Sequence, residues 1–172
     1  MIFSHTHHKN MNTSSSIIKS ALDVLNTEIS GIKLVKKTFD INFVATIKEL
    51  SKVKGRVIIT GIGKSGHIAN KIASTMSSTG TPAQFCHSNE MSHGDLGILS
   101  SKDILIIISN SGNSSELKYA ISFSKKNKIK TIGISSNNKS ELIKSVHYPL
   151  LPPVAKEACA VGKAPTTSTT MT

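Results

Sequence analysis

The sequence predicts an α/β domain, a three-layer αβα sandwich built around a parallel five-stranded sheet. From Gly55 onwards, short apolar segments alternate with segments of helical periodicity, and this alternation is typical of βαβ units. The apolar segments read as strands covered on both faces, which favours a parallel sheet. The length of 172 residues is consistent with a single domain.

Two amphipathic helices are expected before the sheet. Residues 14–29 carry apolar side chains at helical spacing, with serines at 14–16 available as caps, and residues 32–50 repeat the pattern. We expect these helices to cover the sheet or to contact a partner subunit. Residues 1–13 are polar and are expected to form a disordered tail. The domain is then expected over 14–172, with helices at 14–51, an α/β core at 55–150 and a C-terminal loop at 151–172.

Five strands and three helices are expected in the core. The strands fall at residues 56–60, 82–87, 104–109, 130–135 and 146–150, and the helices near 65–78, 114–126 and 140–145. Ligands of such sheets bind beyond the carboxyl ends of the strands. The loops that follow the strands are therefore the candidates for a functional site.

The composition narrows the class of partner. The net charge of +11 favours anions, but Arg56 is the one arginine and aromatic residues make up only 4%, so a nucleic-acid partner is not expected. No segment reaches the about 18 apolar residues of a membrane span. The N-terminus lacks the apolar segment of a signal peptide, so we expect a cytoplasmic protein with no membrane partner. Cys86 and Cys159 form no CxxC motif and are expected to be buried free thiols.

The loop after the third expected strand, Ser109–Glu116, contains four serines, two asparagines and one glycine. Hydroxyls and free backbone N–H groups at a helix N-terminus form a site for an anion such as phosphate. The alternative is an ordinary polar loop that is rich in serine.

The first strand is followed by Gly61-Ile-Gly-Lys-Ser-Gly66, which has the form G-x-G-x-x-G. A dinucleotide site also needs an acidic residue at the end of the second strand, where this chain has Phe85-Cys86-His87. An NAD-binding protein is therefore a weaker alternative. The turn places Lys64 and Ser65 at a helix N-terminus, where Lys64 can neutralise a substrate oxygen or polarise a carbonyl; the other interpretation is an exposed lysine in a tight turn.

Two further loops carry polar groups. The segment His87–Gly97 contains His87, His93, Glu90 and Asp95, and it fits a partial metal site, a proton-transferring histidine or a capping loop. The C-terminal segment 156–170 is rich in threonine and ends the chain as a low-complexity tail, or it starts a helix at Pro165 with a phosphate at its N-terminus.

Taken together, four segments resemble the sugar isomerase (SIS) domain of the D-arabinose 5-phosphate isomerases: GIGKSGHIANKIASTMSSTGTP, HSNEMSHGDLG, SNSGNSSE and VAKEACAVGKAPTTSTT. The resemblance covers roughly residues 14–171 in the same order. It implies the flavodoxin- and Rossmann-like SIS fold and the interconversion of D-ribulose 5-phosphate and D-arabinose 5-phosphate, which supplies the Kdo precursor of lipopolysaccharide. It also implies a sugar-phosphate substrate, no required cofactor and a homo-oligomer, a dimer or a tetramer.

The same resemblance implies site residues. Catalytic roles are implied for Lys64, Glu116 and Glu157, although the sequence does not decide which glutamate is the base. His87 is implied as the position of an inhibitory divalent metal such as zinc. Contacts with the substrate or its phosphate are implied for Ser65, Gly80, Thr81, His87, His93, Ser109, Asn110, Ser111, Ser114, Ser115, Thr167 and Ser168.

The chain also departs from the family pattern. Members of the family continue into a long helix, a segment with a catalytic histidine and usually two CBS modules, whereas this sequence stops at Thr172, so we expect a truncated final helix. Asn113 replaces an acidic residue, and Ser88-Asn89 replaces Pro-Gly after His87. Two functions remain open: an isomerase, and a phosphosugar-binding module without turnover.

Overall fold

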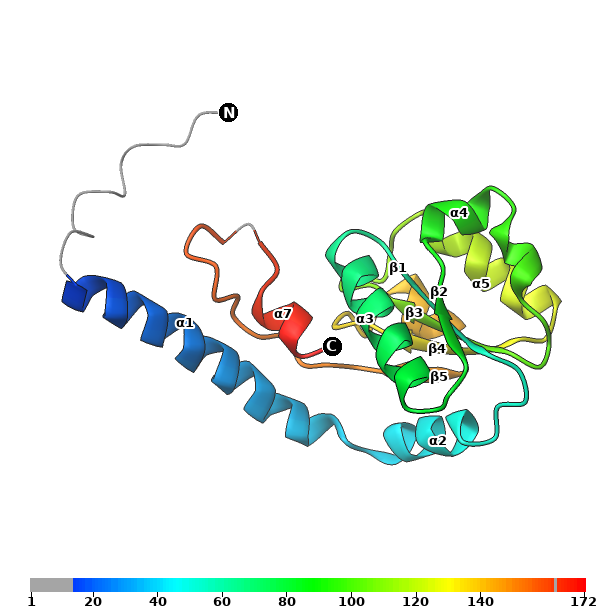
Figure 1. Cartoon of the computed structure of the whole chain (residues 1–172), viewed down its shortest axis with the longest axis horizontal. Helices are drawn as coiled ribbons and strands as arrows, with labels where there is room; N and C mark the ends of the chain where they lie inside the picture. Colours follow the sequence, from blue (N-terminus) through cyan, green and yellow to red (C-terminus); the bar gives the residue numbers. More distant parts are fainter. Residues whose placement is uncertain (1–13, 163) are drawn as a thin grey trace.

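The computed structural model describes residues 14–162 and 164–172; the tail expected at 1–13 lies outside this range. Five parallel strands form one sheet with the order β2-β1-β3-β4-β5, which confirms the expected α/β fold (Figure 1). The strands are β1 (Val57–Gly61), β2 (Ala83–Phe85), β3 (Ile104–Ile108), β4 (Lys130–Ile134) and β5 (Tyr148–Leu150). Val57 of β1 pairs with Ile104 of β3, and Ile104 pairs in turn with Lys130 of β4.

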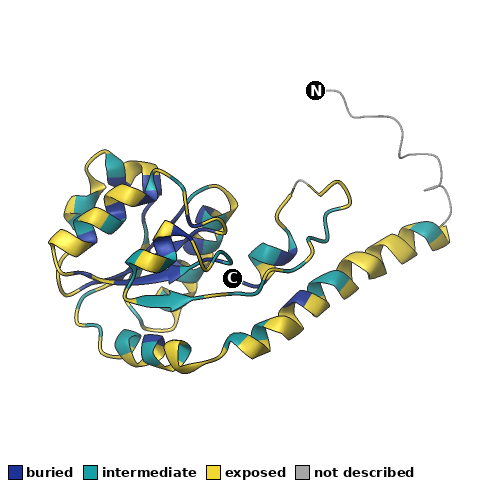
Figure 2. Cartoon of the chain, turned by 180° about the vertical axis from the view of Figure 1, so that it is seen from behind, coloured by how far each residue is buried: buried dark blue, intermediate teal, exposed yellow. Residues whose placement is uncertain are grey.

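Helices cover both faces of the sheet, and the central strands β1 and β3 are buried along their whole length (Figure 2). On one face, Ile58 and Leu105 pack with residues of α5 (Leu117–Lys126), α4 (Ser88–Ser92) and α6 (Glu141–Ser145). On the other, Val57 and Ile106 pack with α3 (Lys64–Ser78) and with the end of α2 (Ile41–Leu50). Because both faces of the sheet are covered, its strands carry apolar residues at successive positions rather than at alternate ones.

The N-terminal helices differ from the expectation. A single helix, α1 (Ser14–Val35), runs through the position near residue 31 where a break was expected, and that expectation is wrong. The chain turns instead at η2 (Lys36–Thr38) and restarts at Asp40, whose Oδ1 accepts the N–H groups of Asn42 and Phe43 at 2.8 and 3.1 Å. The Asp40 cap stabilises the start of a new helix. A single internal glycine weakens a helix without ending it, so α1 continues through Gly31. α1 projects from the body of the molecule and is mostly exposed (Figures 1 and 2).

The segment after β2 is more ordered than a plain loop. It forms α4 and η3 (Asp95–Ile98), and Met91 is buried in the same core cluster as Leu117. The Ser88 and Thr60 hydroxyls lie 3.0 Å apart and share a buried hydrogen bond. These contacts fix the start of the segment over the end of β1.

Two expectations from composition also have a structural outcome. Among the described helices, none combines the length and the apolar character that crossing a membrane requires. Neither cysteine forms a disulfide; Cys86 is buried as expected, whereas Cys159 is partly exposed, which corrects the expectation for that residue.

Candidate functional site

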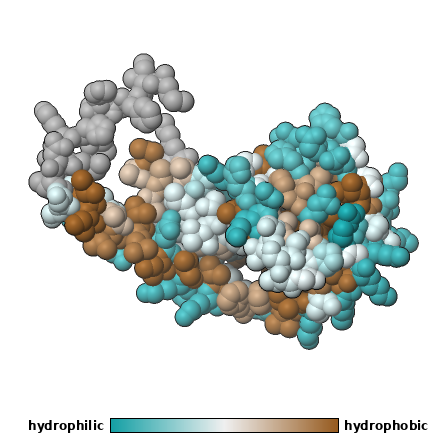
Figure 3. Space-filling view, in the orientation of Figure 1, coloured by the Kyte–Doolittle hydropathy of each residue, from teal (hydrophilic) through white to brown (hydrophobic). Residues whose placement is uncertain are grey.

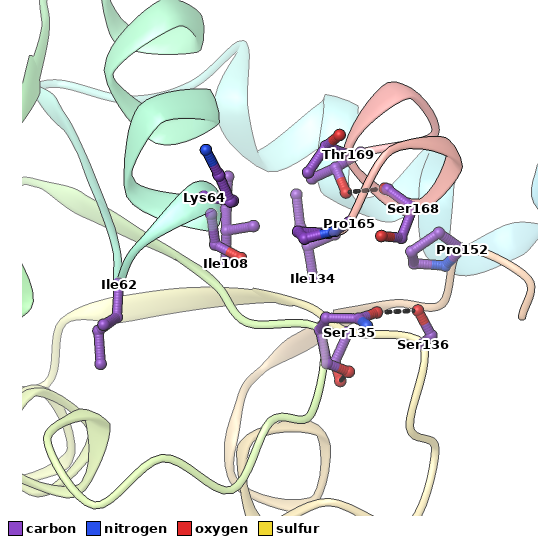
Figure 4. Close-up of a pocket in the computed structure, with 13 residues that line it drawn as sticks. Ile62, Lys64, Ile108, Ile134, Ser135, Ser136, Pro152, Pro165, Ser168 and Thr169 are labelled. Carbon is purple, nitrogen blue, oxygen red and sulfur yellow. Dashed lines mark hydrogen bonds between the residues drawn. The ribbon is translucent and has the colours of Figure 1, made fainter. Parts of the chain in front are cut away.

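A hollow of about 260 Å³ lies at the carboxyl edge of the sheet (Figure 4). β1 and β3 are neighbours in the sheet, yet α3 follows β1 on one face and α5 follows β3 on the other. The loops that follow β1 and β3 therefore diverge, and ligands of open α/β sheets bind in the space between such diverging loops. The hollow is lined by Ile62, Lys64, Ser65, Ile108, Asn110, Ile134, Ser135, Ser136, Pro152, Pro165, Ser168, Thr169 and Thr172.

A second hollow, of about 420 Å³, adjoins the first. Asn110, Ser136 and Ser168 line both hollows, and Glu157 lines the second. We call the two hollows together the carboxyl-edge groove. It brings together Lys64, Ser65, Asn110, Glu157 and Ser168 of the residues predicted from the sequence.

Lys64 is the first residue of α3 and lies on one side of the groove, opposite Ser168 and Thr169 (Figure 4). The preceding Gly63 has φ +56°, so the chain turns sharply from β1 into the helix. Lys64 is exposed, and no carboxylate of the described residues lies within ion-pair distance of its ammonium group. Its charge is therefore available to an anionic ligand.

The serine-rich loop after β3 is ordered by its own side chains. Ser109 Oγ accepts the N–H of Gly112 at 3.1 Å, and Ser111 Oγ accepts the N–H of Asn113 at 3.4 Å. Ser115 Oγ donates to Glu116 Oε2 at 3.1 Å. These bonds shape the loop, and of its residues Asn110 is the one that lines the groove.

The loop after β4 holds the serine-rich loop in place. Ser135 Oγ donates to the Asn110 carbonyl at 3.0 Å, and Ser136 Oγ donates to Asn110 Oδ1 at 2.6 Å. Both serines line the groove, and neither was predicted from the sequence. Their signal was available, because they follow β4 at the same point at which Ser109 and Asn110 follow β3.

Gly112 lies where the serine-rich loop packs against Ser135 and Ser140. Its φ is +65°, and the carbonyl oxygen accepts the N–H of Leu142 at 3.0 Å. A Cβ at this position would overlap the Ser140 side chain and lie 2.9 Å from Ser135 Oγ. The loop geometry therefore requires a glycine here.

The side-chain carboxylate of Glu157 lies at the N-terminus of the short helix α7 (Thr167–Thr170). Its Oε2 accepts the Thr166 N–H at 2.7 Å, the Thr166 hydroxyl at 3.0 Å and the Ser168 N–H at 3.3 Å. A helix does start after Pro165, as one interpretation of the sequence expected, but a carboxylate of the same chain takes the donors at its start.

The environment of Glu157 keeps it ionised. Burial acts to raise its pKa, but the Ser168 hydroxyl and the N–H groups of Thr166 and Ser168 outweigh burial and lower the pKa below its ordinary value. The Ser168 hydroxyl lies near the carboxylate without the geometry of a hydrogen bond. Thr167 is fully buried, and its hydroxyl accepts the Ala158 N–H at 3.1 Å.

The two histidines of the loop after β2 do not line the groove of this chain. His87 caps α4, with Nδ1 accepting the N–H of Asn89 at 3.3 Å, and His93 is the exposed C-terminal cap of the same helix. Within residues 14–162 and 164–172, no three His, Cys, Asp or Glu side chains cluster as a metal site. Zinc at His87 stays a prediction.

The other predicted residues lie further from the groove. Glu116 directly precedes α5 and is half-buried. Gly80 and Thr81 precede β2, so they lie at the amino edge of the sheet, opposite the groove. Ser109, Ser111, Ser114 and Ser115 belong to the serine-rich loop without lining the groove.

Comparison with known proteins adds three findings. Residues 49–172 match the family described as SIS domain. The chain is 45% identical over 161 residues to the arabinose 5-phosphate isomerase KdsD of Francisella tularensis, covering 92% of this chain and 49% of that protein. It is 44% identical over 149 residues to KdsD of Yersinia pestis, covering 87% of this chain and 45% of that protein. The chain thus spans about half the length of the curated relatives it matches.

A solved structure is similar over most of both chains. The E. coli CFT073 protein c3406, determined in complex with arabinose 5-phosphate, superposes with a TM-score of 0.87 at 34% identity. The match covers 92% of this chain and 85% of that one.

Proposed function

Because the chain belongs to the SIS-domain family, we propose that it binds a five-carbon sugar phosphate in the carboxyl-edge groove and interconverts D-ribulose 5-phosphate and D-arabinose 5-phosphate. The proposal places this reaction in the cytoplasm, where it supplies the precursor of Kdo for lipopolysaccharide. The similar protein c3406 was determined in complex with arabinose 5-phosphate, which supports a sugar phosphate as the ligand.

The observation that carries the proposal is the content of the groove. Lys64, which forms no ion pair with the described residues, lines the groove with Asn110, Ser136 and Ser168, and the ionised Glu157 lines the adjoining hollow. A cation, neutral hydrogen-bonding groups and a carboxylate are what a phosphorylated sugar needs for binding and for proton transfer.

The chemistry requires a proton to move between two adjacent carbons through an enediolate. A carboxylate takes the proton from the carbon next to the carbonyl, and a positive group stabilises the developing oxyanion. Lys64 fits the second role because no carboxylate of the described residues lies within ion-pair distance of its ammonium group. The serines around the groove fit the anchoring of the phosphate.

Either of two glutamates fits the role of the base. Glu157 lines the groove and is ionised, but three donors already occupy one of its oxygens. Those donors also lower its basicity, which favours the second candidate function, a phosphosugar-binding module without turnover. Glu116 is half-buried and accepts one hydrogen bond, from Ser115, so fewer donors occupy its carboxylate than occupy that of Glu157.

The proposed reaction needs no cofactor, because the aldose and the ketose have the same oxidation level. A divalent metal such as zinc is proposed as an inhibitor at His87. Nδ1 of His87 accepts the Asn89 N–H, so the proton of the neutral ring is on Nε2. To bind a metal through Nε2, the ring would have to move that proton to Nδ1, and the hydrogen bond from Asn89 would be lost.

We also propose that the chain forms a homo-oligomer, a dimer or a tetramer, through α1. The helix exposes the large apolar side chains Ile17, Ile18, Leu22, Val24, Leu25, Ile29, Ile32 and Leu34. Figure 3 shows apolar residues following one another along this projecting helix. Five of them, Ile18, Leu22, Leu25, Ile29 and Ile32, repeat at alternating spacings of four and three residues, as in helices that pair. A second copy of the chain presents the same stripe.

The binding step is tested by thermal shift and calorimetry with arabinose 5-phosphate, arabinose, inorganic phosphate and NAD. We expect arabinose 5-phosphate to stabilise the wild-type chain and NAD to have no effect. In turnover, Lys64→Ala is expected to lower kcat by about 10²–10³-fold, with a smaller loss of binding, because an oxyanion donor acts mainly in the transition state.

Lys71→Ala provides the matched control, since it removes an exposed lysine from the same helix, α3, at a position outside the groove. It is expected to behave like wild type. Equal losses in both lysine variants would contradict the role given to Lys64, and stabilisation by NAD alone would contradict the proposed ligand.

A further inference from the structure

Gly31 lies in the middle of α1 and makes an unusual contact. It is the one residue of that helix that is buried, although the helix as a whole is exposed. A Cβ at this position would overlap Thr167 Cγ2 and lie 3.1 Å from Met171 Sδ. Glycine destabilises a helix interior relative to alanine, so its presence here needs a structural reason. The contact supplies one, because α7 packs directly on the α1 backbone.

The part of the chain that rests on Gly31 forms one wall of the groove. Thr167 is fully buried and Met171 is 7% exposed, so both face α1 rather than solvent. The next residue, Ser168, lines both hollows of the groove, and its N–H holds the Glu157 carboxylate. The contact with α1 is thus one residue away from a residue of the groove.

The sheet itself does not hold this wall. After β5 ends at Leu150, residues 151–162 and 164–166 contain no strand or helix. The wall is fixed by the Glu157 hydrogen bonds within it and by packing on its neighbours. In Figure 1 the wall lies between α1 and the body of the molecule.

We propose that Gly31 is a positioning residue: through its contact with Thr167, α1 sets the place of Ser168 and Glu157 in the groove. The proposal rests on the proposed function for the identity of the ligand. A methyl group at residue 31 must displace Thr167, and the displacement passes to Ser168 through the backbone. Displacements of about 1 Å in a binding site change rates or affinities by one to two orders of magnitude.

The test uses Gly31→Ala in the full chain, with Ser30→Ala as the matched control. Ser30 is the neighbouring residue and is exposed, and its hydroxyl bonds only within the helix, to the Asn26 carbonyl. We expect Gly31→Ala to weaken the binding of arabinose 5-phosphate about tenfold or more. We also expect faster hydrogen exchange at the Thr166 and Ser168 amides, which is measured without ligand. The control is expected to match wild type in both.

A second substitution makes the test specific. Thr167→Ser removes the methyl group that blocks residue 31 and keeps the hydroxyl that accepts the Ala158 N–H. In the double variant, we expect affinity and amide protection to return toward the wild-type values. If Gly31→Ala alone does not fold, the double variant must fold and bind.

Each outcome decides the proposal. Unchanged amide protection in Gly31→Ala overturns it, and so does a loss that Thr167→Ser does not restore, or a double variant that does not fold. If wild type fails to bind arabinose 5-phosphate, the proposed function fails, and the exchange measurement still decides the role of Gly31.

Discussion

Replacing Gly112 with alanine tests how the serine-rich loop is built. Its φ of +65° costs an alanine about 1–2 kcal/mol. The added Cβ would also lie 2.6 Å from Ser140 Cβ and 2.9 Å from Ser135 Oγ, and both serines are buried. Overpacking of this kind costs about 1–3 kcal/mol. Together the two effects predict a loss of about 2–5 kcal/mol in the free energy of unfolding.

Gly162→Ala separates the two effects. Gly162 has a nearly identical φ of +63°, but nothing lies within 4 Å of its Cβ position. It is expected to lose only the conformational part, about 1–2 kcal/mol. Urea denaturation of wild type and both variants gives the free energies of unfolding, provided that the m-value is unchanged.

The loop is also expected to lose its function in Gly112→Ala. To make room, the Ser135–Asn110 and Leu142–Gly112 hydrogen bonds must lengthen, and Asn110 leaves its place in the groove. Weaker binding of arabinose 5-phosphate is therefore expected beside the loss of stability. Equal destabilisation by the two alanine variants would refute the reasoning, because the close packing at Gly112 would then contribute nothing.

Three further predictions concern stability, assembly and reactivity. Burial acts to raise the pKa of Asp103, but hydrogen bonds from the Arg56 N–H and from Ser100 outweigh burial and lower the pKa. The ionised Asp103 therefore stabilises the folded chain above the unfolded pKa of about 3.9, and this stabilisation is lost as the pH falls through the folded pKa. Asp103→Asn should reduce the acid-dependent fall in the free energy of unfolding measured by urea titration, and an unchanged pH profile would contradict this. Leu25→Asp is expected to give monomers in light scattering whereas Asn26→Asp keeps the oligomer; a monomeric wild type would contradict the assembly through α1. Burial, together with the nearby Asp95 carboxylate, raises the pKa of Cys86 to about 11, so its thiolate fraction at pH 8 is on the order of a hundredfold below that of an unperturbed cysteine, and rapid labelling of Cys86 by a thiol reagent would contradict its burial.

The core of the fold could be predicted from local sequence alone. The continuous apolar run that forms β3 and the glycine turn at Gly61–Gly66 both act within a few residues, so their signals survive in a single sequence. The break in the N-terminal helices was misplaced because Gly31 serves a contact with Thr167, which lies more than a hundred residues away in the chain. No periodicity reveals a contact of that kind.

The candidate site was predictable only in part. Lys64, Ser65, Asn110, Glu157 and Ser168 were named from motifs and lie around one groove. Ser135 and Ser136 were missed although they follow β4 as Ser109 and Asn110 follow β3, because only the pairing of β3 with β4 shows that the two loops meet. The motifs also did not predict the three hydrogen bonds that Glu157 accepts from Thr166 and Ser168, because these bonds depend on the path of a segment without regular structure.

The central claim is that this groove carries out aldose–ketose isomerisation. The most direct measurement is proton exchange, followed by NMR, at the carbon next to the carbonyl when arabinose 5-phosphate is incubated with the wild-type chain in D₂O. We predict that deuterium enters at that carbon and that Lys64→Ala slows its entry by about 10²-fold or more. Binding of arabinose 5-phosphate without any exchange would contradict the isomerase and leave the phosphosugar-binding module.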